Sequence, residues 1–142
     1  MIKKISPPFN PVFSWYIKKR IHQIDLFRKY PCEVQEETLF SLISRAKLTE
    51  FGKKHGFESI NSYNEYKNRV PISDYQKIEP FINRLKKGEK NILWPSEVKW
   101  FAKSAGTTSG KSKFIPVTKE ALDNCHYKGG KDLLALYYSN HT

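Results

Sequence analysis

The sequence is poor in the residues that mark disulfide-rich, zinc-binding and membrane-spanning proteins. Its 142 residues include two cysteines, Cys32 and Cys125, which form no C-x-x-C pair and have no histidines at ligand spacing. This spacing gives no support to a disulfide framework or a zinc site, and we expect two reduced, buried thiols. No apolar run approaches the ~18 residues that span a bilayer. Pro7, Pro8 and Pro11 interrupt the N-terminus, which does not resemble a secretory signal. A cytoplasmic protein is therefore expected.

Negative charge is also scarce, because 25 Lys and Arg face 14 Asp and Glu, for a net charge of +11. A basic nucleic-acid-binding module is one class that such an excess could indicate. However, only five of the basic residues are arginines, and the lysines are scattered along polar positions without interleaved aromatics. We therefore prefer a solvated lysine-rich surface and expect neither a nucleic acid nor a membrane as partner. Apolar residues at 39% favour one globular domain.

The first half of the chain shows helical periodicity. Apolar residues recur three or four positions apart over residues 12–30, and again over residues 33–47, where Leu39, Leu42, Ile43 and Ala46 share a face. Pro31 separates these two predicted helices, and a short continuation ends at Gly56.

Two shorter helices are predicted from capping-box spacing, Ser62 with Glu65 and Ser73 with Gln76. In the second of them we expect Pro80 to start a new turn and Gly88 to close the helix. Trp15, Trp94 and Trp100 lie among apolar residues and are predicted to anchor the core.

From residue 92 onward the pattern favours strands. Residues 98–102 read as one strand and KFIPV, residues 113–117, as a second. Thr118 stands at an N-cap position before a long helix that Gly129 and Gly130 could kink. The predicted fold class is therefore α/β: a mainly helical region over residues 1–91, a strand-loop-strand over 92–117, and a helix over 118–139.

The loop between the two strands carries the chemistry. KSAGTTSGKSKFIPVT combines glycines for close backbone approach, hydroxyls that donate hydrogen bonds, and lysines that offset negative charge, which together suit a phosphate. Two kinds of phosphate loop fit this composition, and a plain mobile turn is the third possibility. A nucleoside-triphosphatase P-loop, G-x-x-x-x-G-K-[ST], would use Gly110, Lys111 and Ser112, but its first glycine is replaced by Ala105.

The residues after Lys111 discriminate between the two loops. A P-loop lysine must open a helix, whereas Ile115, Pro116 and Val117 start helices poorly. The alternative is a hairpin whose loop covers a triphosphate and leaves by a strand. We favour the hairpin, and keep the P-loop nucleotide-binding protein as the alternative.

The same stretch resembles the ATP-phosphate loop of adenylate-forming enzymes, specifically the auxin-responsive-type acyl acid amido synthetases in their bacterial branch. LTEFGKKHGF, the long run SYNEYKNRVPISDYQKIEPFINRLKKGEKNILWPSEVKWFAKS, and NCHYKGGKDLLALY resemble the same family. The resemblance extends from about Leu48 to the C-terminus.

The resemblance implies an enzyme that joins ATP to a carboxylic acid, with Mg²⁺ sharing the phosphate charge, and then lets an amine or amino acid displace AMP to give an amide. It implies Lys111 as the catalytic cation. The residues implied to bind ATP phosphates are Ser104, Gly106, Thr107, Thr108, Ser109, Gly110 and Lys111. The family motif usually has a hydroxyl or small residue at position 105, and Ala105 lacks the hydroxyl.

The family fold that the resemblance implies is a large N-terminal α/β domain followed by a smaller mobile domain. Members of the family run to several hundred residues, so we expect this chain to be an incomplete N-terminal part of the large domain. The C-terminal domain and the motifs for adenine, ribose and the acyl group would then be absent, and the chain alone would be inactive.

Overall fold

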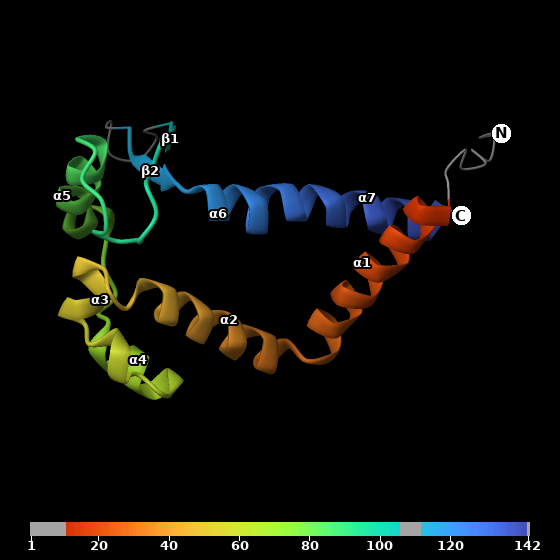
Figure 1. Cartoon of the computed structure of the whole chain (residues 1–142), viewed down its shortest axis with the longest axis horizontal. Helices are drawn as coiled ribbons and strands as arrows, with labels where there is room; N and C mark the ends of the chain where they lie inside the picture. The colour runs from red at the N-terminus through yellow and green to blue at the C-terminus, as the bar shows by residue number, and fades with distance from the viewer. Residues whose placement is uncertain (1–10, 106–111, 142) are drawn as a thin grey trace. The chain divides into compact units, whose positions relative to one another are not determined.

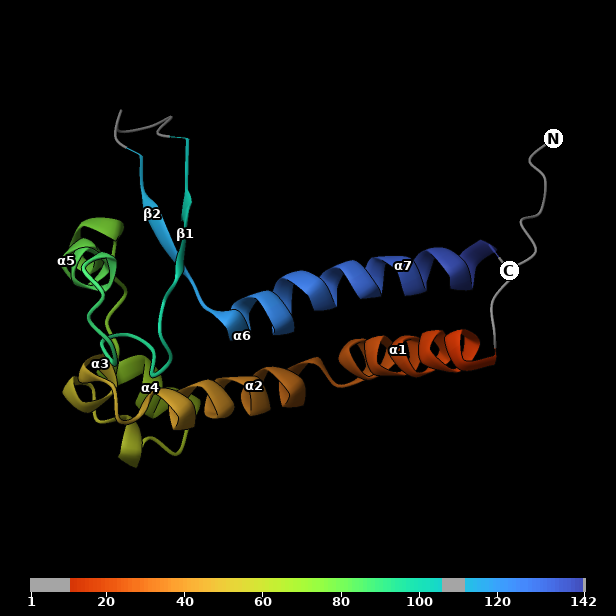
Figure 2. The same ribbon diagram turned by 45° about the horizontal axis from the view of Figure 1, so that its top comes forward.

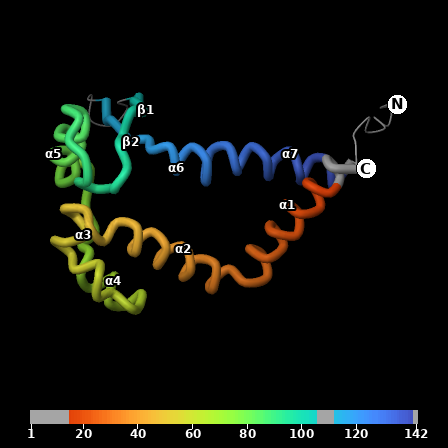
Figure 3. The backbone as a smooth tube through the Cα atoms, viewed as in Figure 1, coloured from red at the N-terminus to blue at the C-terminus, as the bar shows by residue number. Residues whose placement is uncertain are grey.

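The computed structural model describes residues 11–105 and 112–141. The chain divides into two compact units, the first made of Met1–Val34 with Glu120–Thr142 and the second of Gln35–Lys119. Helices dominate both units, and two short strands lie in the second (Figures 1 and 3). No helix in the described ranges is long and apolar enough to cross a membrane.

The first unit pairs the helices α1 (Pro11–Lys29) and α7 (Lys128–His141), which lie side by side in Figure 2. Arg20 of α1 is 7% exposed and forms an ion pair with Asp132 of α7, with its Nε donating to Oδ1 at 2.7 Å. Nearer the end of α1, Phe27 has Lys128 over its ring at 5.9 Å. Because the partner numbers fall along α7 as they rise along α1, the two helices are antiparallel.

The long C-terminal helix is predicted correctly in position but is not regular. It starts as α6 (Lys119–Ala121), directly after Thr118, continues as a π-helical segment (Leu122–Tyr127) and becomes α7. Gly129 and Gly130 lie inside α7, so the irregular turns precede the glycine pair. A π-helix has one extra residue per turn and is most often seen near functional sites.

Helix α2 (Pro31–Ala46) begins with Pro31, whose missing N–H leaves nothing unsatisfied in a first turn. The proline therefore both ends the first predicted helix and starts the next. The second unit has its core around the end of α2, where Ile43 and Ala46 are buried with Phe57 and Ile60. Leu42, which the sequence places on the same face, is 49% exposed.

The N-terminus of α3 (Glu50–Lys54) has its free backbone donors satisfied from three sources. The amide of Glu50 donates to the Asn91 carbonyl at 2.9 Å, and that of Phe51 to the Ile92 carbonyl at 3.0 Å. The buried Thr49 hydroxyl accepts from Gly52 N–H at 3.0 Å and donates to the Ala46 carbonyl. These bonds tie α3 to the chain segment that leads into the hairpin.

The caps of the next helices confirm one expectation and correct another. Ser62 caps α4 (Tyr63–Arg69) by accepting from Glu65 N–H at 3.2 Å, and the Glu65 carboxylate in turn accepts from Asn61 N–H. The predicted Ser73 cap of α5 (Tyr75–Lys86) is wrong. Asp74 caps that helix by accepting from Lys77 N–H at 3.0 Å, while the Ser73 hydroxyl donates to the Pro71 carbonyl.

Pro80 lies inside the continuous helix α5 and does not start a new turn as predicted. A proline there removes one backbone bond, but the apolar face that buries Ile82 and Leu85 keeps the helix continuous. Gly88 has φ of 89°, a conformation that a glycine adopts freely, and it follows the end of α5 as expected.

Strands β1 (Trp100–Lys103) and β2 (Phe114–Val117) form an antiparallel hairpin in which Lys103 faces Phe114 and Phe101 faces Pro116. This confirms the predicted strand-loop-strand, with β1 shifted by about two residues. In such a pair hydrogen-bonded positions alternate with non-bonded ones. Ser104 N–H donates to the Lys113 carbonyl at 2.9 Å, which puts Pro116 at a non-bonded position where it removes no ladder bond.

Several side chains are more exposed than the sequence indicated. Cys32 and Cys125 are free but exposed, not buried. Of the three tryptophans, only Trp94 packs against the core of the second unit, whereas Trp15 is 61% and Trp100 51% exposed. The prediction that Trp15 and Trp100 anchor the core is therefore wrong. Apolar neighbours in the sequence do not ensure burial, because burial depends on which elements pack over a side chain.

We expect Gly52→Ala to lower the free energy of unfolding by about 2 to 3 kcal/mol. A Cβ on Gly52 would stand 2.1 Å from the Ala46 carbonyl oxygen, a backbone atom that cannot move without breaking the α2–α3 connection. The measurement is urea unfolding followed by circular dichroism. Gly130→Ala is the control, because a Cβ there meets nothing within 4 Å and should stabilise α7 by about 0.5 to 1 kcal/mol. Equal effects of the two variants would contradict the close approach at Gly52.

Candidate functional site

The mouth of the hairpin is fixed by Ser104 and Lys113. Besides the Ser104 N–H bond to the Lys113 carbonyl, the Lys113 N–H donates to Ser104 Oγ at 3.1 Å. The side-chain oxygen thus takes the place of the Ser104 carbonyl in the last rung of the ladder. The hydroxyl hydrogen of Ser104 remains available for a further acceptor. Ala105 follows Ser104 at the start of the loop.

The other residues predicted to contact phosphates lie outside the described residues. These are Gly106, Thr107, Thr108, Ser109, Gly110 and Lys111. Their roles stay predictions, and Ser104 is the member of the predicted set that the structure places, at the base of the loop.

The chain leaves the loop as a strand. Ser112 and Lys113 are not helical, and β2 begins at Phe114. A nucleoside-triphosphatase P-loop requires a helix at this point, so the described residues do not support that alternative.

The hairpin segment carries positive charge. Residues 98–118 contain four lysines and neither Asp nor Glu. Beside the strands, Lys86 of α5 lies over the Phe114 ring at 3.9 Å and Lys113 over the Tyr75 ring at 5.5 Å. Both ammonium groups belong to exposed residues. Glu97 lies 3.9 Å from Lys99, and the other lysines leave the surface basic, which suits an anionic ligand.

Tyr75 contacts the backbone of the hairpin directly. Its hydroxyl accepts from the Phe114 N–H at 2.9 Å and donates to the Phe114 carbonyl at 3.4 Å. Tyr75 and Phe114 are 39 residues apart, and no local pattern predicts such a pair.

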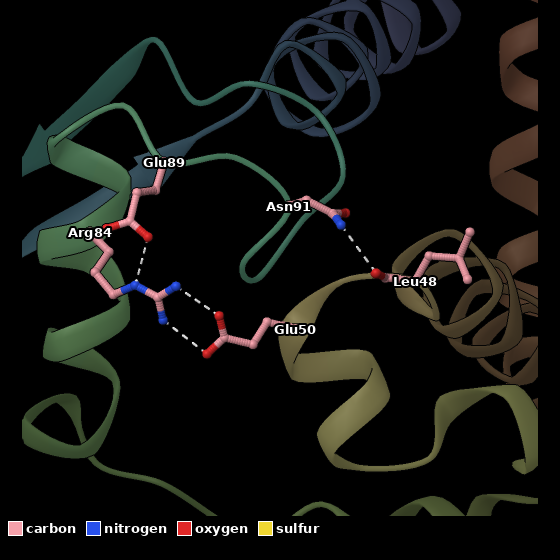
Figure 4. Close-up of polar contacts among 5 residues, drawn as sticks. All are labelled: Leu48, Glu50, Arg84, Glu89 and Asn91. Carbon is pink, nitrogen blue, oxygen red and sulfur yellow. Dashed lines mark hydrogen bonds and ion pairs between the residues drawn. The ribbon is translucent and has the colours of Figure 1, made fainter.

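Polar contacts fix α5, which carries Tyr75, against α3 (Figure 4). The Arg84 guanidinium makes two hydrogen bonds to the Glu50 carboxylate at 2.9 and 2.8 Å, and its Nε donates to Glu89 at 2.8 Å. Asn91, in a left-handed conformation with φ of 59°, donates from its side chain to the Leu48 carbonyl at 3.1 Å. The hydrogen bonds from Arg84 lower the pKa of the Glu50 carboxyl, and those from Glu50 and Glu89 raise the pKa of Arg84.

The described residues therefore form helices and a two-stranded hairpin, and the sequence between the two strands is rich in glycine and lysine. Residues 20–142 match the GH3 family N-terminal domain, and the chain belongs to that family. The identified family is the auxin-responsive type that the loop and its flanking motifs resemble.

The relatives include amido synthetases from plants. The chain is 34% identical over 92 residues to the indole-3-acetic acid-amido synthetase GH3.6 of Arabidopsis thaliana, covering 64% of this chain and 15% of that protein. It is 30% identical over 125 residues to the jasmonoyl-L-amino acid synthetase JAR4 of Nicotiana attenuata, covering 87% of this chain and 21% of that protein. The chain thus spans about a fifth or less of the relatives' length. Membership of the bacterial branch stays a prediction.

The fold matches that of a solved structure, the GH3.15 acyl acid amido synthetase, with a TM-score of 0.77 at 24% identity. The match covers 94% of this chain and 24% of that one. The predicted fold class, a helix-rich portion with a small hairpin, is thereby confirmed.

We expect the Glu50–Arg84 pair to stabilise the fold at neutral pH and to lose this effect in acid. Because the pKa of Glu50 is lowered in the folded chain, its contribution is fully present above its ordinary value of 4.5 and disappears as the pH falls through the folded value. The melting temperature of Glu50→Gln should therefore lie below that of the parent chain at pH 7, and the gap should narrow as the pH falls below 4.5.

Glu79→Gln on the exposed face of α5 provides the matched control. Its melting curve should follow the parent at both pH values. A gap between Glu50→Gln and the parent that persists unchanged at pH 3 would contradict a role for the Glu50 charge.

Proposed function

We propose that this chain forms the phosphate-binding N-terminal part of an ATP-dependent ligase that activates a carboxylic acid as its acyl-adenylate and joins it to an amine or amino acid. The observation that carries the proposal is the glycine-rich loop whose two ends are paired strands closed by Ser104 and Lys113. The relatives named as amido synthetases of indole-3-acetic acid and as jasmonoyl-L-amino acid synthetases support the reaction class.

The residues at the hairpin suit the triphosphate of ATP. Lys111 and Lys113 supply cations, and the hydroxyls and backbone N–H groups of residues 104–110 supply hydrogen-bond donors. Such groups stabilise negative charge that builds on the phosphates as pyrophosphate leaves, without forming covalent bonds. Lys113 joins the predicted set because its backbone position is fixed at the loop's exit and its ammonium belongs to an exposed residue.

Mg²⁺ would supply further charge neutralisation when bound. The described residues contain no group of three or more His, Cys, Asp or Glu that could hold a metal ion. Mg²⁺ commonly binds through substrate phosphates, water and one or two carboxylates, not through an all-protein cage. The site that we propose therefore receives the ion together with the nucleotide.

In this proposal residues 1–142 are an incomplete portion of the large adenylate-forming domain, with a mainly helical part over 1–91, the loop-bearing part over 92–117 and the helix over 118–139. The acid and amine substrates would be small molecules. We expect the chain alone to bind phosphates without completing the ligase reaction.

We expect Lys113→Ala and Lys111→Ala each to weaken MgATP binding by roughly tenfold, the effect of removing one charge-assisted contact. The measurement is isothermal titration of the chain with MgATP and, separately, with tripolyphosphate at two salt concentrations. Phosphate-driven binding should weaken for both ligands as salt rises.

Lys67→Ala is the control variant, since Lys67 is exposed on α4. It should bind MgATP as the parent chain does. Absence of binding of both MgATP and tripolyphosphate by the parent chain would overturn the proposal, and equal losses in Lys67→Ala and Lys113→Ala would show a diffuse charge effect in place of a site.

A further inference from the structure

The exit of the loop has an anchor outside the hairpin. Because Ser104 and Lys113 form a hydrogen-bonded pair, the next pair, Lys103 and Phe114, is a non-bonded one. In an antiparallel ladder the backbone N–H and carbonyl of a non-bonded residue point away from the partner strand. Both backbone groups of Phe114 therefore face outward from β1, and this geometry would leave them unpaired within the hairpin.

The Tyr75 hydroxyl meets both of these groups. It accepts from the Phe114 N–H at 2.9 Å and donates to the Phe114 carbonyl at 3.4 Å. A phenolic hydroxyl has one hydrogen and two lone pairs, so it can make both bonds at once. One side chain thus satisfies the pair of backbone groups that a third strand would otherwise satisfy.

Tyr75 is itself held in place. It is the first residue of α5, directly after the Asp74 cap. At the other end of the same helix, Lys86 lies 3.9 Å from the Phe114 ring centre, and Arg84 is hydrogen-bonded to Glu50 of α3. Phe114 is therefore contacted from both ends of α5, and Arg84 fixes that helix to α3.

We propose that Tyr75 is a positioning residue for the phosphate site, whose hydroxyl holds the exit strand so that Lys113 faces the phosphates. This inference rests on the proposed function. Phe114 lies one residue after Lys113, so a shift of the strand moves this cation. Loss of the hydroxyl leaves the outward groups of Phe114 without their partner and lets the exit strand move.

The test is Tyr75→Phe, which keeps the ring beside Lys113 and removes only the hydroxyl. We expect the dissociation constants of MgATP and of tripolyphosphate to rise together by about fivefold, the factor of a typical net hydrogen bond. Titrations are made well below the melting temperature of each variant, which is measured in parallel. The matched control is Tyr63→Phe, an exposed tyrosine on α4 that should bind both ligands as the parent does.

The outcomes separate the two proposals. A lower melting temperature of Tyr75→Phe with unchanged dissociation constants would reduce Tyr75 to a structural role and overturn the inference, while weaker binding in Lys113→Ala would leave the proposed function standing. A parent chain that binds neither ligand overturns the proposed function and this inference with it. The inference is supported if Tyr75→Phe binds both MgATP and tripolyphosphate more weakly than the parent chain while Tyr63→Phe binds both as the parent does.

Discussion

The second unit depends on how the first turn of α3 is satisfied. A helix begins with backbone N–H groups that have no partner within the helix, and here the amides of Glu50 and Phe51 donate to the carbonyls of Asn91 and Ile92. The segment that receives them is the one that leads into β1. Ile92, 1% exposed, is buried at the same place, so polar and apolar contacts fix the segment together. The hairpin thus starts from a fixed point.

An ion pair between α5 and α3 also fixes the first turn of α3. Arg84 joins the C-terminal half of α5 to Glu50, the first residue of α3, and an acidic residue in a helix's first turn also interacts favourably with the helix dipole. Since the pair is partly exposed, its contribution is screened by water. Its value is geometric: a two-point guanidinium-carboxylate contact fixes orientation as well as distance.

Local patterns were sufficient to predict most helices and the two strands. The helical periodicity of residues 12–30 and 33–47, the Ser62 cap and the strand-like KFIPV are short-range signals, and the structure bears them out. Composition predicted a phosphate loop at Ser104 and the residues after it, and that role stays a prediction. Two local predictions were wrong. Asp74, not the neighbouring Ser73, caps α5. The helix also continues through Pro80 because Ile82 and Leu85 are buried on its apolar face.

Burial and long-range contacts could not be predicted from these short-range signals. Whether Cys125 or Trp100 is buried depends on what packs over it, which no spacing reveals. Tyr75 and Phe114 meet only because α5 and β2 are brought together across 39 residues. Lys113 was added to the proposed site only once the last hydrogen-bonded pair of the ladder had been located. Long-range pairs of this kind are therefore the part of the candidate site that required coordinates.

The outer edge of β2 also determines how the sheet can grow. Phe114 and Pro116 are the residues of this strand whose backbone faces away from β1, and a neighbouring strand would have to bond to them. Tyr75 occupies the groups of Phe114, and Pro116 has no N–H to offer. Strand addition is thus blocked on that side, which protects the hairpin from pairing with other chains there. Any larger sheet built on this hairpin must extend from β1.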